Sequence, residues 1–175
     1  MKLEKISMLL GVIVMILLAF LIVWQADILG VSAARLEQDA RENQKIDNSW
    51  EVAQGMNEDI CAMLFYTQER DKCTYSIYVS REGLSFGYFF GKGGTDAYMT
   101  ENVEAVVLED KGIALLSLNH DEVCKIVVGE DSDETVIPVN PGKPFALVLP
   151  LDCGEITLYD TRENVVTLYD TYTGI

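Results

Sequence analysis

The chain carries few of the side chains on which enzyme active sites are usually built. Its single histidine, His120, falls in the segment Asn119-His120-Asp121, directly after an apolar strand-like run. A serine–histidine–aspartate triad would have to use this one histidine. A metal site rich in histidine is excluded for the same reason. We expect His120 to be an exposed turn residue, and we expect no catalytic residue, metal ligand or cofactor.

The four cysteines are Cys61, Cys73, Cys124 and Cys153, and they include no Cys-x-x-Cys pair of the zinc-ribbon kind. If the chain is exported, disulfides are the natural expectation, and four cysteines allow three pairings. Cys61 and Cys73 flank a predicted hairpin and would pair with each other, which leaves Cys124 for Cys153. The alternative is a set of buried free thiols, since Cys73 and Cys124 each lie on the apolar side of an alternating strand.

Two turn-like segments have compositions typical of ligand-binding loops. The run Gly91-Lys92-Gly93-Gly94-Thr95 lacks the glycine, five residues before the Gly-Lys pair, that a phosphate-binding loop requires. The run Glu130-Asp131-Ser132-Asp133-Glu134 collects carboxylates, but their spacing does not match a calcium-binding EF-hand loop. We expect the first to be a flexible hairpin loop that presents Lys92, and the second to be a solvated turn.

Aromatic side chains gather on two strands that we predict to be neighbours, at Tyr75, Tyr78, Phe86, Tyr88, Phe89 and Phe90. Alternation places Tyr78 and Phe89 on the outward side of their strands, where two rings make a flat platform for a sugar or a protein. With Lys92 they form the candidate binding surface. The alternative is that both faces of these strands are covered, which would bury both rings.

The longest apolar run covers Ile6 to Trp24, without a charged side chain. This length suits a helix that crosses the roughly 30 Å hydrocarbon core of a bilayer. Ile6 and Trp24 mark its two ends, and Trp24 is typical of an interfacial anchor. Lys2 and Lys5 precede the run, which predicts a single-pass cell-membrane protein with a cytoplasmic N-terminus, an extracytoplasmic C-terminal domain and the bilayer as a partner. The alternative is a cleaved signal peptide, for which Val31-Ser32-Ala33 resembles a cleavage site.

Acidic side chains outnumber basic ones by 28 to 13, which gives a formal net charge of −15 at pH 7. A surface of this sign repels phosphate backbones, so nucleic acid is excluded as a partner. The negative charge either keeps an exported domain soluble or binds a cationic partner. The partner class left open is a protein or a glycan at the cell surface.

The sequence divides into a cytoplasmic tail over 1–5, a transmembrane helix over 6–25, a helical stalk over 26–60 and an extracytoplasmic domain over 61–175. The stalk is rich in good helix formers, and Glu37 and Arg41 are spaced to form an i,i+4 ion pair.

Beyond the stalk the hydrophobic period changes to two, and turn residues recur about every ten residues. Strands are expected at 62–67, 74–80, 84–90, 103–108, 112–119, 123–128, 134–139, 144–150, 155–160 and 164–169. This pattern predicts an all-β head, an antiparallel sandwich of immunoglobulin-like or jelly-roll-like type with roughly 8–10 strands.

Three segments, 87–90 (Gly-Tyr-Phe-Phe), 143–146 (Lys-Pro-Phe-Ala) and 154–160 (Gly-Glu-Ile-Thr-Leu-Tyr-Asp), resemble segments of uncharacterised small exported proteins of Gram-positive bacteria. The resemblance covers about the last 90 residues. It implies an exported location and no activity.

These observations predict a membrane-anchored extracytoplasmic β-sandwich module with a binding or structural role at the cell surface and no catalysis. One alternative is a pilin-like or pseudopilin-like fibre or envelope-assembly subunit, which shares the layout but needs a Gly-Phe processing site that the chain lacks. A second alternative is a small carboxylate-dependent hydrolase, although no pair of carboxylates stands out among the 28 acidic residues.

Overall fold

A computed structural model describes residues 10–18, 20–21, 28–83, 85–95, 102–108, 110–129 and 133–173. Within these residues a 3-10 helix, η1 (Ala33–Arg35), leads into α2 (Leu36–Gln44), and strands follow to the C-terminal end. The strands are β1 (Glu51–Met56), β2 (Ile60–Tyr66), β3 (Cys73–Ser80), β4 (Tyr88–Gly94), β5 (Val103–Leu108), β6 (Gly112–Ser117), β7 (Val123–Gly129), β8 (Thr135–Pro138), β9 (Phe145–Leu149), β10 (Glu155–Asp160), β11 (Val165–Val166) and β12 (Leu168–Thr173).

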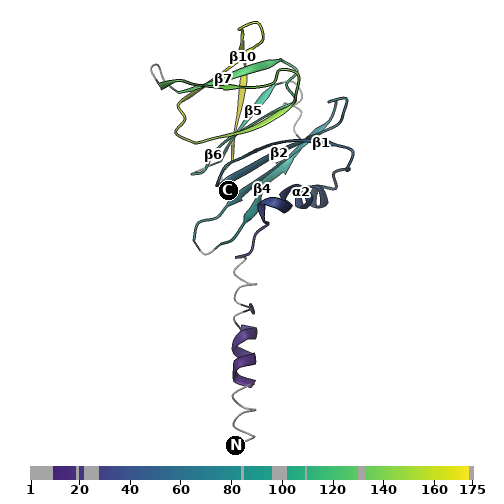
Figure 1. Cartoon of the computed structure of the whole chain (residues 1–175), viewed down its shortest axis with the longest axis vertical. Coiled ribbons are helices and arrows are strands. Elements are labelled where there is room, and N and C mark those ends of the chain that lie inside the picture. The colour runs from purple at the N-terminus through teal and green to yellow at the C-terminus, as the bar shows by residue number, and fades with distance from the viewer. Residues whose placement is uncertain are drawn as a thin grey trace, which may run out of the picture.

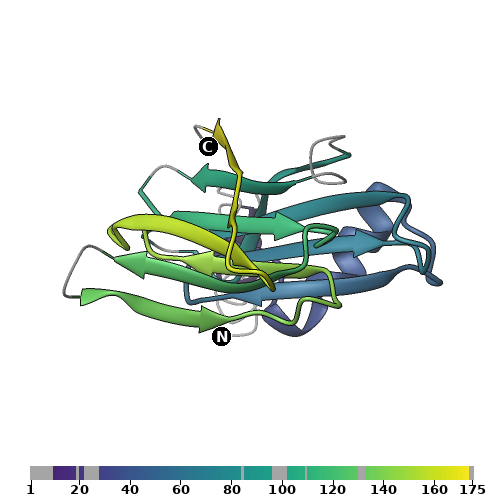
Figure 2. The ribbon, with the colours of Figure 1, turned by 90° about the horizontal axis from the view of Figure 1, so that it is seen from above.

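These strands form three four-stranded sheets that stack on one another. The first sheet has the order β1-β2-β3-β4, the middle sheet β12-β5-β6-β9, and the outer sheet β11-β10-β7-β8. Neighbouring strands are antiparallel except for β12, which runs parallel to β5. Figure 1 shows α2 on one side of the first sheet, β5 and β6 on its other side, and β7 and β10 beyond them. Most strands lie along broadly the same axis, in alternating directions (Figure 2).

The first and middle sheets pack face to face through alternate side chains of β2, β3, β5 and β6. Their shared core contains Ile60, Ala62, Leu64, Tyr66, Cys73, Tyr75, Ile77, Val79, Val106, Leu108, Ala114, Leu116 and Leu118. The intervening residues of β2 point the other way, toward α2, so all seven residues of this strand are buried. Each large apolar side chain buried in this way contributes about 1.5–3 kcal/mol.

The middle sheet is covered on its second face by the outer sheet. Val103, Ala105 and Leu115 of the middle sheet pack there against Ile126 of β7 and Leu158 of β10. The outer sheet has no further layer above it among the described residues, so the residues that alternate with its core positions face water. The outer sheet therefore has a face that is open to a ligand and is carried on rigid strands.

The helix α2 covers the first sheet with a narrow apolar stripe. Leu36 and Ala40 are one helical turn apart and fully buried, against Cys61, Met63 and Phe65 of β2.

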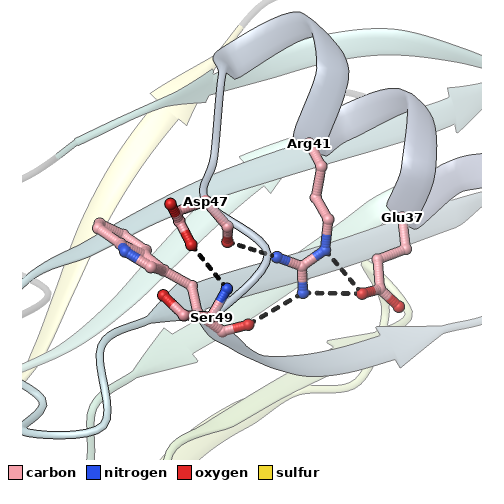
Figure 3. A network of polar contacts seen from close by, with 5 residues as sticks. Glu37, Arg41, Asp47 and Ser49 are labelled. Carbon is pink, nitrogen blue, oxygen red and sulfur yellow. Dashed lines mark hydrogen bonds and ion pairs between the residues drawn. The ribbon is translucent and has the colours of Figure 1, made fainter.

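Arg41 ties this helix to the chain that enters β1 (Figure 3). Its Nε donates a 2.8 Å hydrogen bond to Glu37, which confirms the i,i+4 pair predicted from the sequence. Its Nη1 and Nη2 donate to the carbonyl oxygens of Asp47 and Trp50, each at 3.1 Å. The guanidinium also lies 5.0 Å from the centre of the Phe65 ring. One side chain thus joins the helix, the following turn and the face of the first sheet.

The predicted transmembrane helix over 6–25, and the single-pass membrane localisation drawn from it, are wrong. Among the described residues no helix has both the length and the apolar character to cross a bilayer. The described helical residues of this segment are 10–18 and 20–21. The rest of the predicted span, with its end residues Ile6 and Trp24, lies outside the described residues.

The predicted helical stalk over 26–60 is also wrong, because the described part of this segment belongs to the β-rich body. Gly30 and Val31 donate backbone hydrogen bonds of 2.8 and 2.7 Å to the carbonyl oxygens of Phe86 and Tyr88, at the edge of β4. Next, α2 packs on the first sheet, and β1 forms the edge of that sheet opposite β4. The β-rich domain agrees with the prediction, but it holds three stacked sheets where a two-sheet sandwich was expected.

Candidate functional site

The aromatic platform expected from the sequence is not assembled, because its two rings lie on opposite faces of the first sheet. Tyr78 is fully buried beneath α2, where its hydroxyl donates a 2.6 Å hydrogen bond to Oδ2 of Asp39. Burial and this hydrogen bond together raise the pKa of Tyr78. Phe89 is paired with Val79, the next residue along β3, and is 7% exposed. The guanidinium of Arg81 lies 3.9 Å from the centre of the Phe89 ring, so neither ring offers a free face to a ligand.

The glycine-rich run is part of a strand, so the flexible loop predicted there is wrong. β4 continues to Gly94, and Lys92 pairs with Ile77 of β3 in a half-buried position. A side chain at Gly93 would place its Cβ 2.5 Å from Nε2 of Gln44, the last residue of α2. The glycine therefore serves the packing of α2 on the first sheet.

All four cysteines are free thiols. Cys61 lies opposite Tyr78 in the ladder between β2 and β3, five residues along the strand from Cys73. That spacing corresponds to roughly 16 Å, whereas a disulfide requires Cα atoms within about 7 Å. Cys124 and Cys153 likewise lie near opposite ends of the ladder between β7 and β10. Strand register therefore keeps apart both pairs that the sequence suggested.

His120 is an exposed turn residue, which confirms the expectation from the sequence. Its Nε2 lies 3.2 Å from the carbonyl oxygen of Arg70, in the turn between β2 and β3. In the part of the chain that the structure describes, no group of three or more His, Cys, Asp or Glu side chains is placed to hold a metal ion. Of the acidic turn predicted before β8, residues 130–132 lie outside the described residues.

The solvent-facing side of the outer sheet carries an open groove of about 670 Å³. β7 and β10 each contribute alternate residues to it and β8 contributes Val136; β7 and β10 lie at the end of the stack far from α2 (Figure 1). Val127 pairs with Val136 on one side and with Thr157 on the other. These three side chains form a β-branched floor at the middle of the groove, with charged groups at both of its ends.

One end, which we call the lysine end, consists of Lys125, Tyr159 and Glu163. Lys125 and Tyr159 are partners in the ladder between β7 and β10, and the lysine Nζ lies 4.7 Å from the centre of the tyrosine ring. The same Nζ forms an ion pair with Oε2 of Glu163. The hydrogen bond to Glu163 raises the pKa of Lys125. The groove therefore already holds one ammonium between an aromatic face and a carboxylate.

Glu163 is positioned by the tight turn between β10 and β11. Oδ1 of Asp160 accepts hydrogen bonds from the backbone N–H groups of Arg162 and Asn164, at 2.7 and 2.8 Å. Oδ2 of Asp160 accepts a 2.9 Å hydrogen bond from Nδ2 of Asn164. These hydrogen bonds lower the pKa of Asp160, and the two from Asn164 contribute most. The ionised Asp160 side chain thus fixes the turn that points Glu163 at Lys125.

The other end, which we call the acidic end, consists of Gly129, Glu134 and Glu155. Glu155 is the Cα partner of Gly129 on β10. A Cβ on Gly129 would lie 2.6 Å from the carbonyl oxygen of Asp133 and 3.1 Å from Cα of Glu134. Only glycine therefore lets the backbone of Asp133 and Glu134 pass this close to β7. Glu134 and Glu155 are exposed on either side of this glycine. Neither carboxylate has a hydrogen-bond or ion-pair partner among the described residues.

Comparison with family models, curated proteins and solved structures finds no match to this chain. The resemblance to small exported proteins therefore stays a prediction, and the candidate site has to be judged by its own geometry. The sequence contained one signal for it, the alternation of Glu155, Thr157 and Tyr159 with Ile156 and Leu158. The sequence did not reveal the strand register that places these residues beside β7 and β8.

Proposed function

We propose that this chain is a non-catalytic binding module, and that the groove on the outer sheet is where its ligand or partner lies. The observation that carries the proposal is the groove itself, about 670 Å³ in volume, with a β-branched floor between two charged ends. Small-molecule sites typically measure about 300–1,000 Å³ and combine apolar contact with a few oriented polar groups. The strands beneath the floor are held by the core shared with the middle sheet, so the groove is pre-formed.

Binding suits the groups in this groove better than catalysis does. Its two hydroxyls belong to Thr157 and Tyr159, and among the described residues neither is hydrogen-bonded to a side chain able to act as its base. Its one lysine is already paired with Glu163. Nucleophilic catalysis needs an activated nucleophile next to a base, and this arrangement supplies neither.

The test is chemical-shift mapping on the full chain with four probes: a basic peptide, an acidic peptide, a neutral peptide and a neutral oligosaccharide. Binding in the groove predicts that at least one probe shifts the methyl signals of Val127 and Val136 and the amide signals of β10. Val106, in the core between the first and middle sheets, serves as the internal control and should not move. If no probe shifts groove signals, or if every shift lies on other surfaces, the proposed function is wrong.

A further inference from the structure

The two ends of the groove differ in how their charge is compensated. At the lysine end the carboxylate of Glu163 is neutralised by Lys125. At the acidic end Glu134 and Glu155 face the same groove, and Lys125 is the one cation among the described residues that line it. The acidic end therefore offers acceptors that a partner's cation would satisfy.

The lysine end shows how this surface accommodates a cation. An ammonium rests 4.7 Å from the centre of the Tyr159 ring and pairs with a carboxylate, both from this chain. The acidic end lies four residues further along β10, from Tyr159 to Glu155, which is about 13 Å in an extended strand. A cation at the acidic end is thus too far from Lys125 for the two charges to repel strongly, since the Debye length is about 8 Å at physiological salt.

The floor between the ends matches an extended polypeptide. Lys125, Val127 and Gly129 are spaced two residues apart, so their positions repeat about every 6.6 Å along β7. An extended peptide presents side chains to one side with the same period. A basic side chain held between Glu134 and Glu155 then places the side chain two positions away on Val127 and Val136, where an aliphatic group fits.

On these grounds, and resting on the function proposed above, we propose that the groove binds an extended peptide segment of a partner protein through an arginine or lysine side chain seated between Glu134 and Glu155, with an aliphatic side chain two positions away on the Val127–Val136 floor.

The experiment measures the affinity of the full chain for a fluorescent heptapeptide, Arg-Ser-Val-Ser-Arg-Ser-Val, in which each valine lies two positions from an arginine and so on the same side of the extended peptide. The peptide in which glutamate replaces arginine is the first control. The double variant Glu134→Gln/Glu155→Gln removes both acceptors of the acidic end. The double variant Glu58→Gln/Glu69→Gln removes two exposed carboxylates from turns of the first sheet, so it changes the net charge by the same amount away from the groove.

The arginine peptide should bind at least about tenfold more tightly than the glutamate peptide, because only the former is complementary in charge. The Glu134→Gln/Glu155→Gln variant should weaken its binding about fivefold, from roughly 0.5 kcal/mol for each exposed charge pair. The Glu58→Gln/Glu69→Gln variant should change it less than about twofold, because those sites are outside the contact.

Three results would overturn the inference, and one of them separates it from the proposed function. If both double variants weaken binding equally, the peptide is attracted by the overall negative charge of the protein and not by Glu134 and Glu155 in particular. Binding of spermine with the same affinity as the peptide would mean that the site takes a small amine. If the neutral oligosaccharide or the acidic peptide shifts groove signals while the arginine peptide shifts none, the groove is a binding site but its ligand is of another class.

Discussion

Replacing Asn119, which joins the middle and outer sheets, should lower the free energy of unfolding more than a change of similar size on the surface. Asn119 is 3% exposed and ends the segment that leaves β6. Its Oδ1 accepts a 2.7 Å hydrogen bond from the N–H of Val123, at the start of β7. Its Nδ2 lies 3.2 Å from the carbonyl oxygen of Val123, and 3.0 and 3.2 Å from those of Asn140 and Lys143, between β8 and β9. One amide therefore joins two inter-sheet connections.

The expected cost follows from these contacts. The two N–H groups and the oxygen of the amide make about three hydrogen bonds, each with a net value near 1 kcal/mol, so Asn119→Gly should lower the free energy of unfolding by about 3 kcal/mol. The backbone at this position has φ of 57°, a left-handed conformation in which alanine costs about 1 kcal/mol more than glycine. Asn119→Ala should therefore lower the free energy of unfolding by about 4 kcal/mol.

Urea unfolding of the full chain measures both values, and Asp110 supplies the matched control. Asp110 has φ of 64° but is exposed, in the hairpin turn between β5 and β6. Asp110→Gly should change the free energy of unfolding by less than about 0.5 kcal/mol, and Asp110→Ala should cost about 1 kcal/mol. If Asn119→Gly is no more destabilising than Asp110→Gly, the amide does not hold the two connections together and this reasoning is refuted.

Three further predictions test other parts of the structure. Leu36→Ala should lower the free energy of unfolding by about 2–4 kcal/mol in urea, because Leu36, the first residue of α2, is fully buried against β2. A loss below about 1 kcal/mol would mean that α2 is not packed on the sheet. Alkylation in denaturant without reductant should modify all four thiols, and a mass that shows an intact disulfide would contradict the strand register. In the native protein at pH 8, Cys61 should react slowly with the same reagent, because burial raises its pKa to about 11. Asp160 has a folded pKa below its usual 3.8, so its contribution to stability is complete above that pH and is lost as the pH falls through the folded pKa. Asp160→Asn should therefore flatten the loss of stability on acidification, and an unchanged acid limb in pH-dependent unfolding would rule this contribution out.

Local signals predicted the strands of this protein well, because each strand and turn is encoded by neighbouring residues. The expected strands at 103–108 and 155–160 coincide with β5 and β10, and most others differ at their ends by a few residues. The exceptions have physical causes. β1 was assigned to the stalk because its sequence, Glu-Val-Ala-Gln-Gly-Met, has no clear apolar alternation. The buried stripe of α2 consists of only Leu36 and Ala40, which gave too weak a pattern to separate a packed helix from a solvated one.

The arrangement of the sheets was beyond local patterns, because it depends on pairs far apart in the chain. The parallel pairing of β12 with β5 joins residues 168 and 103, and the pairing of β10 with β7 joins residues 155 and 129. The same pairings decide the candidate site. Tyr78 and Phe89 were expected outside because the cover supplied by α2 and the middle sheet was unknown, and the groove on the outer sheet was missed because its register was unknown.

The most direct test of a peptide-binding groove is to find which carboxylates a bound basic peptide touches. A zero-length carbodiimide coupling joins a peptide lysine amine to a carboxylate in contact with it, and mass spectrometry identifies the glutamate. Coupling of the heptapeptide Lys-Ser-Val-Ser-Lys-Ser-Val to the full chain should be concentrated on Glu134 and Glu155 and should be suppressed by excess of the arginine peptide. Coupling spread evenly over exposed acids such as Glu58 and Glu69, or unaffected by the competitor, would contradict the account.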